Sequence, residues 1–336
     1  MFISNGQGVV QASLWRRCPA LRPRAWRGSG RAAALPAVYS LPMTLAAWLP
    51  AIEALTRRAG EVVMAVYATD FAVQGKADAS PVTLADQQAE AVILAGLRAL
   101  TPQIPIVAEE AMAAGDAPPL TAGGRFWLVD PLDGTREFVA RNGQFTVNIA
   151  LIDNGRPVLG VVLAPAVAAA NPGPGGVPGG ARSGARSGAP GVAQSGAPLG
   201  CLYAGIVGQG AWAEDAGGRR AIRCRTAPPE GLTVLASRSH GDEAALQAFL
   251  SRHLAGRRVA QLATAGSSLK LCLLAAGQAD LYPRLGRTME WDIAAGHAVL
   301  AAAGGSVCRV DDGGPLVYGK LGFENPHFFA RGATGP

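Results

Sequence analysis

The segment WLVDPLDGTREF, residues 127–138, carries two aspartates whose spacing suits metal chemistry. Asp130 follows an apolar run typical of a buried strand that ends there, and Pro131 fixes the backbone that comes next. This turn can direct the Leu132 carbonyl and the Asp133 carboxylate toward one point. Clustered hard oxygen ligands of this kind are those that Mg²⁺ prefers, so the segment predicts one side of a magnesium site.

Two further acids can complete this site, and the residues after Asp133 suit an anion. Gly134 allows a close backbone approach to a ligand, and its amide and that of Thr135 can open a short helix that seats a phosphate. Glu109 follows the short apolar strand predicted at IPIVA, and Asp292 begins a predicted helix. Taken singly, a D-x-x-D-G segment is often only a capped turn, and Asp292 is most simply a helix cap. Taken together, the acids favour a metal site.

The spacing of the two aspartates also bears on the mechanism. Phosphatases that form an aspartyl phosphate use D-x-D-x-T, in which the second acid stands two residues after the first. Here Asp133 stands three residues after Asp130. The pattern therefore favours attack by a metal-activated water over a covalent aspartyl intermediate.

Hydrophobic periodicity predicts the elements that carry these residues. Apolar residues recur every three or four positions from Leu45, which indicates a helix, and Pro81 and Thr83 mark the start of a second one. Asn154-Gly155 joins two apolar runs and predicts a tight hairpin. After about residue 226, strand-like and helix-like segments alternate, as in an α/β domain. We therefore predict an N-terminal α+β domain at 43–225 that carries the metal site, a C-terminal α/β domain at 226–331, and a site at their junction.

Two segments fall outside this pattern. Residues 166–199 consist largely of Gly, Pro, Ala and Ser, cannot bury a core, and read as a flexible loop inserted into a sheet hairpin. Residues 1–42 hold six arginines and no acid, so they resemble a transit peptide. A start at Met43 with a misassigned upstream region is an equally good interpretation. In both cases we expect residues 1–42 to be a disordered leader outside the fold.

The charge of the chain excludes one class of function for its body. The formal net charge is +6, but without residues 1–42 the chain balances 24 basic against 24 acidic residues. A basic body would have indicated binding to nucleic acid phosphates, and a neutral body does not. The uncharged run at 158–170 is too short to span a bilayer, which needs ~20 residues.

The motifs AEE, WLVDPLDGTREF and WDIAAGHAVLAAAGG, in this order, resemble the signature segments of the inositol monophosphatase superfamily. The resemblance covers residues 43–330 apart from the Gly-rich loop. It implies a mixed α+β and α/β fold, an α-β-α-β-α layered sandwich of two subdomains with the active site between them. It also implies a lithium-sensitive phosphatase that uses two to three Mg²⁺ ions.

The resemblance assigns roles to individual residues. Glu109, Asp130 and the Leu132 carbonyl would hold one Mg²⁺, whereas Asp130, Asp133 and Asp292 would hold a second, and a third, weaker ion would lie near Glu109. The catalytic residues would be Glu109, Thr135 and Asp86, of which the last two orient and deprotonate the attacking water. Asp86 has an ordinary alternative as an acid in the first turn of a helix.

Within the superfamily, the second half of the chain is most similar to the CysQ-type 3′(2′),5′-bisphosphate nucleotidases. This implies that Lys270, Arg284 and Ser267 grip the 5′-phosphate of adenosine 3′,5′-bisphosphate (PAP), with His240 near the nucleoside. Gly134 and Thr135 would contact the 3′-phosphate, which is hydrolysed to give AMP; PAPS would give APS. Asp292 would also belong to the substrate-binding residues. Taken singly, a lysine or arginine at such a position is more often a solvated surface residue.

Two other functions remain open from the sequence. One is an inositol or sugar monophosphate phosphatase of the same superfamily. The other is a non-catalytic protein that binds a nucleotide or RNA through its Arg-rich leader. For the enzyme, the resemblance implies a small-molecule nucleotide substrate, no nucleic acid partner for the core, and a cytoplasmic location that allows peripheral attachment to the inner membrane. It also allows a homodimer.

Overall fold

The computed structural model describes residues 44–69, 73–75, 81–168, 200–237, 243–254 and 256–333, with the side chains of 73–75 and 81–83 left aside. The predicted leader at 1–42, most of the predicted insert at 166–199, and His240 lie outside the described residues.

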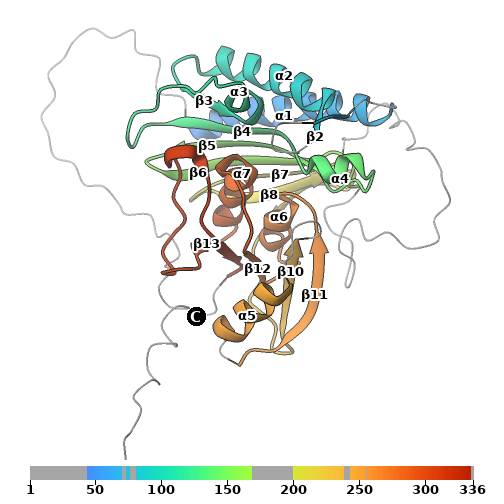
Figure 1. Cartoon of the computed structure of the whole chain (residues 1–336), viewed down its shortest axis with the longest axis vertical. Helices are drawn as coiled ribbons and strands as arrows, with labels where there is room; N and C mark the ends of the chain where they lie inside the picture. Colours follow the sequence, from blue (N-terminus) through green and yellow to red (C-terminus); the bar gives the residue numbers. More distant parts are fainter. Residues whose placement is uncertain are drawn as a thin grey trace, which may run out of the picture.

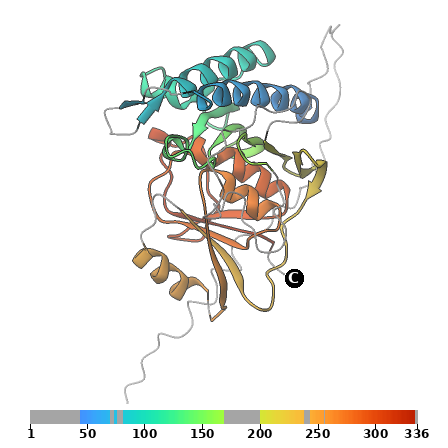
Figure 2. The ribbon, with the colours of Figure 1, turned by 90° about the vertical axis from the view of Figure 1, so that its right-hand side faces the viewer.

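The described chain is a stack of five layers in which helices and sheets alternate (Figures 1 and 2). Two helices cover a seven-stranded sheet, two more helices lie beneath it, a five-stranded sheet follows, and one helix covers the far side. The predicted α-β-α-β-α sandwich is therefore confirmed.

The large sheet has the strand order β3-β4-β5-β6-β7-β8-β9, so chain neighbours are also neighbours in space. β3 is parallel to β4, and every other adjacent pair is antiparallel. Its strands are β3 (Ile106–Ala108), β4 (Phe126–Asp133), β5 (Thr146–Asp153), β6 (Arg156–Ala164), β7 (Cys201–Ile206), β8 (Gly210–Asp215) and β9 (Gly218–Ile222).

Two connections in this sheet follow the sequence signals. β5 and β6 are joined by Asn154 and Gly155, which both have positive φ, 51° and 69°, as a two-residue hairpin turn with the matching twist requires. β6 and β7 pair with Ala164 opposite Cys201, so the residues between these strands leave and re-enter the sheet at one place. The predicted hairpin at Asn154-Gly155 is confirmed.

Helices α1 (Leu45–Tyr67) and α2 (Leu84–Leu100) cover the outer face of the large sheet. Their buried faces include Ile52, Val63 and Ile93, which are fully buried against the sheet. α2 begins at Leu84, three residues later than Pro81, where the sequence placed its start. Residues Pro81–Thr83 instead form β2, which pairs with β1 (Val73–Gly75). Proline has no amide hydrogen, and at the end of a short edge strand none is needed for pairing.

The small sheet has the order β11-β10-β12-β14-β13, with β10 parallel to β11 and β12, and β14 antiparallel to its two neighbours. Helix α5 (Glu243–His253) packs on its outer face, where Phe249 lies against Phe329. The strands are β10 (Leu232–Ser237), β11 (Val259–Ala265), β12 (Leu281–Arg284), β13 (Ser306–Arg309) and β14 (Phe328–Arg331).

Helices α6 (Leu269–Ala275) and α7 (Glu290–Ala302) form the middle layer, where both sheets contribute to one hydrophobic core. α7 lies so close to the large sheet that a Cβ on Gly160 would stand 2.3 Å from the Ala295 carbonyl oxygen. The predicted division near residue 225 falls between the two sheets. Because α6 and α7 come from the second half and pack on the sheet of the first, the two halves share a core.

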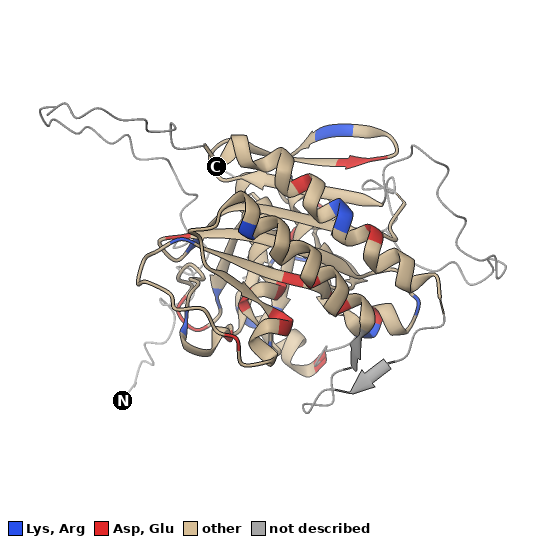
Figure 3. Ribbon diagram, turned by 90° about the horizontal axis from the view of Figure 1, so that it is seen from above, with Lys and Arg blue, Asp and Glu red and all other residues tan. Residues whose placement is uncertain are grey.

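The outer surface of the first layer carries charges of both signs. Seen from above, both basic and acidic residues lie along α1 and α2, so they do not form one basic face (Figure 3). In the described part of the chain, no helix has the length and apolar character needed to cross a membrane.

Candidate active site

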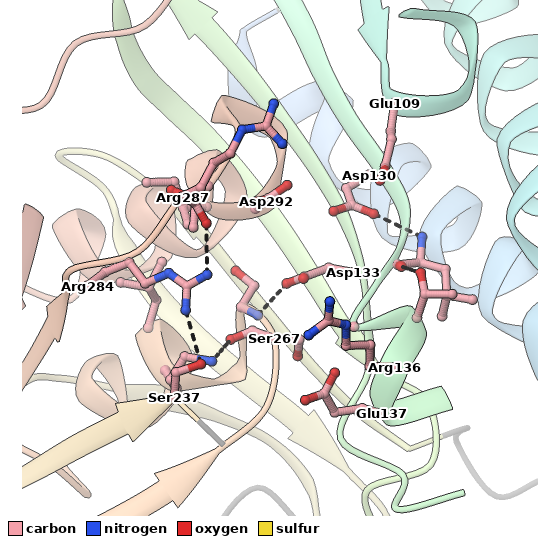
Figure 4. A pocket seen from close by; sticks show the side chains of 18 of the residues that line it. Glu109, Asp130, Asp133, Arg136, Glu137, Ser237, Ser267, Arg284, Arg287 and Asp292 are labelled. Atoms are coloured by element: carbon pink, nitrogen blue, oxygen red, sulfur yellow. Dashed lines mark hydrogen bonds between the residues drawn. The ribbon is translucent and has the colours of Figure 1, made fainter. Parts of the chain in front are cut away.

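A pocket lies between the two halves of the molecule, at the edge where β4, β10, β12 and the N-terminus of α7 meet (Figure 4). One side of it is acidic and comes mainly from the first half. The other side is basic and comes from the second half. The lining residues are Glu109, Asp130, Leu132, Asp133, Gly134, Thr135, Arg136, Glu137, Ser237, Ser267, Ser268, Lys270, Leu271, Tyr282, Arg284, Arg287, Thr288, Asp292 and Ile293.

The acidic side is built on an irregular stretch of β4. The strand does not end at Asp130, as the sequence suggested, but continues to Asp133 through a shift in its pairing with β5. Such a bulge re-aims side chains without ending the strand, which is why a proline is tolerated inside it. The Leu132 amide donates to Asp130 Oδ1 at 3.0 Å, which fixes that carboxylate at the bulge.

Gly134 turns the chain from β4 into the short helix α4 (Thr135–Val139). Its φ of 92° lies in the left-handed region, where a side chain would be strained. Thr135 Oγ1 donates to the Leu132 carbonyl at 3.4 Å, so the hydroxyl lies beside the bulge.

Glu109 reaches the same place from the neighbouring strand. β3 is parallel to β4, with Ala108 opposite Val129, so the residues that follow both positions emerge at the same edge of the sheet. Glu109 is the first residue of the short helix α3 (Glu109–Ala113) and lies next to Asp130 in Figure 4.

Asp292 comes to the pocket from the second half, in the first turn of α7. The Met289 amide donates to Asp292 Oδ2 at 2.8 Å, so this carboxylate caps the helix. The capping interpretation and the pocket interpretation are both correct, because one carboxylate oxygen caps while the side chain lines the pocket.

The electrostatics of the acidic side reflect a concentration of buried negative charge. Burial, followed by the charges of Glu109, Asp133, Asp292 and Asp86, raises the pKa of Asp130 well above its usual range. Burial, followed by the charges of Asp133 and Glu109, likewise raises the pKa of Asp292 well above its usual range. A cation in the pocket would offset this negative charge and favour the ionised form of both acids.

Asp86 stands behind the pocket rather than on its surface. It is 1% exposed, lies in the first turn of α2, and is near enough for its charge to raise the pKa of Asp130. This position of Asp86 is compatible with both roles considered for it, an acid in the first turn of a helix and a catalytic acid.

The residues present fit a divalent cation. The donors are hard oxygens, as Mg²⁺ requires, and the Asn148 Oδ1 atom beside them is buried without a hydrogen-bond partner. Within the described ranges, no three His, Cys, Asp or Glu side chains already close around one point.

Lys270 stands at the boundary between the two sides of the pocket. Its ammonium donates to the carbonyls of Ala265 at 3.1 Å and Ser267 at 2.7 Å, and lies 5.3 Å from the centre of the Tyr282 ring. Burial lowers the pKa of Lys270 to about 8, the charge of Asp133 acts in the opposite direction, and Arg284 lowers it further. The ammonium is thus held by the loop before α6.

Arg284 ends β12 and supplies the second buried cation. It donates to Ser237 Oγ at 3.0 Å and to the Arg287 carbonyl at 2.9 Å. Its Nε is buried and has no hydrogen-bond partner. An unused donor on a buried guanidinium that lines a pocket suits an anionic ligand.

The loop before α6 connects the two sides. Ser267 has a positive φ of 46°, and the amide of Ser268 donates to Asp133 Oδ2 at 2.5 Å. Gln144 Oε1 accepts from the Gly266 amide at 2.9 Å, which ties the same loop to the first half.

Every predicted site residue in the described ranges lines this pocket except Asp86, which lies behind it, whereas His240 is outside those ranges. The sequence did not single out several lining residues. Arg136 and Glu137 belong to the quoted aspartate motif, and Ser237 ends a predicted strand, so a signal existed for these three. Tyr282 also lies in a predicted strand, whereas Arg287 and Thr288 carried no such signal.

The layered fold and this acidic pocket define a class of protein. The chain belongs to the inositol monophosphatase family, whose sequence model matches residues 45–330. Members of this family are metal-dependent phosphatases.

The curated relatives are more specific. The chain is 44% identical over 277 residues to the 3′(2′),5′-bisphosphate nucleotidase CysQ of Escherichia coli O157:H7, covering 82% of this chain and 95% of that protein. It is 44% identical over 255 residues to the CysQ of Salmonella typhimurium, covering 75% and 87%.

A similar structure is that of CysQ from Bacteroides thetaiotaomicron, with a TM-score of 0.63 and 30% identity, covering 85% of this chain and 97% of that one. The inositol monophosphatase from Anabaena, at 24% identity and a TM-score of 0.59, shares the fold.

Proposed function

We propose that this chain is a 3′(2′),5′-bisphosphate nucleotidase that hydrolyses the 3′-phosphate of PAP to give AMP and phosphate, and converts PAPS to APS. The observation that carries the proposal is a pocket with an acidic and a basic side in a chain 44% identical to nucleotidases of that name. A bisphosphate needs both sides, because one phosphate is cleaved and the other is only held.

The acidic side would hold Mg²⁺, two to three ions per site. We assign the ligands to Glu109, Asp130, Asp133, Asp292 and the Leu132 carbonyl. When bound, Mg²⁺ lowers the pKa of a water and offsets the charge that develops on the phosphate oxygens.

The proton of the attacking water needs an acceptor from the chain. We assign this role to Thr135 together with Asp86, and a supporting role to Glu109. Thr135 Oγ1 lies at the bulge, 3.4 Å from the Leu132 carbonyl, and Asp86 contributes to the raised pKa of Asp130. Gly134 and Thr135 would also contact the 3′-phosphate, and Asp292 would be a further substrate-binding residue.

The basic side would hold the 5′-phosphate through Lys270, Arg284 and Ser267. Two features support this assignment: the unpartnered Nε of Arg284 and the burial of both cations. The carbonyl contacts of Lys270 keep its ammonium in place, so little side-chain freedom is lost when a phosphate binds.

The test is a phosphate-release assay on PAP, PAPS, 3′-AMP and inositol 1-phosphate, with and without Mg²⁺. We expect PAP to have the highest kcat/KM and activity to require Mg²⁺. Arg284→Lys should lower kcat/KM for PAP by roughly tenfold or more and leave 3′-AMP nearly unchanged, because Lys cannot reproduce the planar donor set. Preference for inositol 1-phosphate would favour the sugar phosphatase and refute the assignment of Lys270 and Arg284.

Asp130→Asn tests the assignment of the metal ligands. We expect the variant to stay folded and kcat to fall on the order of a thousandfold, since offsetting charge at the reacting phosphate contributes several kcal/mol. Undiminished turnover in this variant would exclude Asp130 as an essential ligand.

Location and assembly complete the proposal. We infer a cytoplasmic enzyme, with peripheral attachment to the inner membrane and a homodimer as further expectations. Cell fractionation and light scattering of the purified chain test these two points.

A further inference from the structure

Two glutamates outside the pocket lining, Glu90 and Glu290, are 5% and 0% exposed. A buried carboxylate is costly unless several donors satisfy it. In both cases the donors are backbone amides of a segment beside the pocket.

Glu90 lies on α2, one turn after Asp86, and reaches across to α3. Its Oε2 accepts from the Glu110 amide and its Oε1 from the Ala111 amide, both at 2.8 Å. These amides belong to the first turn of α3, whose own N-cap, Ala108, has no side chain that can cap.

A helix of five residues is not stable by itself, so its position depends on such contacts. α3 begins with Glu109, and the two amides that Glu90 binds are those of the next two residues. Glu90 therefore sets where the backbone of Glu109 lies relative to β4.

Glu290 performs the equivalent task at α7. It accepts from the amides of Gly319 at 2.7 Å and Lys320 at 3.0 Å, and from the Lys320 ammonium at 2.6 Å. The same ammonium donates to Asn325 Oδ1 at 3.2 Å. The segment 317–325 is thereby fastened to the first turn of α7.

Asn325 continues this connection to the pocket. Its Nδ2 donates to the Met289 carbonyl at 2.7 Å, and its amide donates to the Thr288 carbonyl at 2.9 Å. The Met289 amide in turn donates to Asp292 Oδ2. Both polar backbone groups of Met289 are therefore held, and the carboxylate of Asp292 is oriented by one of them.

We propose that Glu90 and Glu290 are a pair of positioning residues, one in each half of the chain, that hold in place the backbone segments from which Glu109 and Asp292 would bind a divalent cation. The inference deepens the proposed function and rests on it for the identity of the reaction. Neither glutamate touches the substrate or the metal. Each acts through the backbone of the segment that carries a ligand.

The test uses Glu90→Gln and Glu290→Gln in the full chain, with Mn²⁺ as the probe. Glutamine keeps the volume but places an NH₂ group against a backbone N–H. Binding of Mn²⁺ is followed by electron paramagnetic resonance of the free ion, which reports the metal without turnover. We expect the Kd for Mn²⁺ to rise roughly 10- to 100-fold in each variant, the range typical of residues that orient metal ligands.

The matched control is Glu53→Gln. Glu53 is also a buried glutamate, 9% exposed, with bonds to Trp212 at 2.8 Å and Arg219 at 3.0 Å, but these lie on the far side of the large sheet from the pocket. We expect its loss to lower the Tm and to leave the Mn²⁺ Kd unchanged.

Turnover of PAP separates the two proposals. We expect the Mg²⁺ concentration for half-maximal activity to rise in both glutamine variants, while KM for PAP at saturating Mg²⁺ stays within about twofold. If the wild-type chain hydrolyses PAP and both variants keep wild-type metal affinity, the inference is overturned and the proposed function stands. If the wild type hydrolyses none of the substrates but Mn²⁺ affinity falls in both variants, the inference stands and the proposed function is overturned.

A second pair of variants covers failure to fold. Glu90→Asp keeps the charge but is too short to span both amides, and Lys320→Met removes the ammonium while leaving the amide bonds of Glu290 in place. Each should raise the Mn²⁺ Kd by a smaller factor than the glutamine change. Unchanged affinity in both would again overturn the inference.

Discussion

Asp133 lies at the boundary between the acidic and the basic side of the pocket. Burial raises its pKa to about 6, and the charge of Lys270 opposes that rise. The Ser268 amide, which donates to its carboxylate, comes from the other half of the molecule. The protonation state of this one side chain therefore affects how tightly the two halves hold together.

The metal-free protein should lose stability as pH rises from about 4 to about 6. The pKa of Asp133 is 3.8 in the unfolded chain and about 6 in the fold, so the folded state binds the proton more tightly. The stabilisation is fully present below the unfolded pKa and is lost as pH passes the folded pKa, by about 3 kcal/mol for this group. Burial shifts the pKa values of Asp130 and Asp292 in the same direction.

Thermal unfolding in a chelator between pH 4 and pH 8 measures this effect. Asp133→Asn should flatten the decline, and added Mg²⁺ should raise the Tm more at pH 7.5 than at pH 5. A metal-free protein that becomes steadily more stable between pH 4 and pH 7 would contradict the expectation.

At the residue scale, the sequence predicted what local motifs carry. Asp130, Asp133 and Gly134 stand within five residues, so their place in one pocket could be predicted without the fold. Glu90 and Glu290 could not be recognised from the sequence, because they bind the backbone amides of Glu110 and Gly319. Every residue except proline has a backbone amide, so such a partner leaves no pattern in the sequence. A side chain that acts through distant backbone has no motif of its own.

At the scale of elements, the position of α7 connects the core to the pocket. Gly160 on β6 and Gly205 on β7 leave room for it, since a Cβ on Gly205 would stand 2.8 Å from Ala302 Cβ. The helix that packs here begins with the turn that carries Asp292. A change in packing should therefore be felt in catalysis.

Gly160→Ala should lower both stability and turnover. The new Cβ would stand 2.3 Å from the Ala295 carbonyl, and backbone cannot move aside as a side chain can. We expect a loss of about 1–3 kcal/mol in the free energy of unfolding, together with a fall in kcat as α7 shifts. Urea denaturation and the PAP assay measure the two effects.

The control for this change is Gly96→Ala on α2. Its Cβ would meet the flexible end of Leu55, at 2.5 Å from Cδ1, and alanine favours the helix. Turnover should stay at the wild-type level. Equal losses of turnover in the two alanine variants would show that the packing of α7 does not affect catalysis more than the packing of α2.

Element boundaries show where sequence periodicity stops being informative. The strand predicted to end at Asp130 continues to Asp133, because pairing with β5 resumes at Thr146 after the bulge. The helix predicted from Pro81 begins at Leu84, because residues Pro81–Thr83 pair with the strand Val73–Gly75. In both cases long-range pairing decides the boundary, and the sequence holds only the local preference.

At the scale of the whole molecule, all the residues found to line the pocket in the described part of the chain lie well after Thr44. Removing residues 1–42 should therefore leave kcat and KM for PAP unchanged. The same pair of chains tests the alternative in which the Arg-rich leader binds RNA. RNA binding by the full chain alone, with no phosphatase activity in either form, would favour that alternative.

Removing residues 169–199 should also leave turnover intact. β6 and β7 are already neighbours, with Ala164 opposite Cys201, so a short Gly-Ser linker can join them. We expect a change in the free energy of unfolding of at most about 1 kcal/mol, since loop length affects closure entropy only slowly. Loss of phosphatase activity in a folded deletion variant would assign the segment to the site.

The central layer has a consequence for biosynthesis. The large sheet is complete in sequence at Ile222, but α6 and α7, which bury one of its faces, end only at Ala302. At a translation rate of about 5–20 residues per second, roughly 4 to 16 s separate these two points on the ribosome. During that interval the nascent chain exposes an apolar sheet surface that invites chaperone binding. The helix that covers it also carries Asp292, so release from the chaperone and arrival of the last acidic residue of the pocket would coincide.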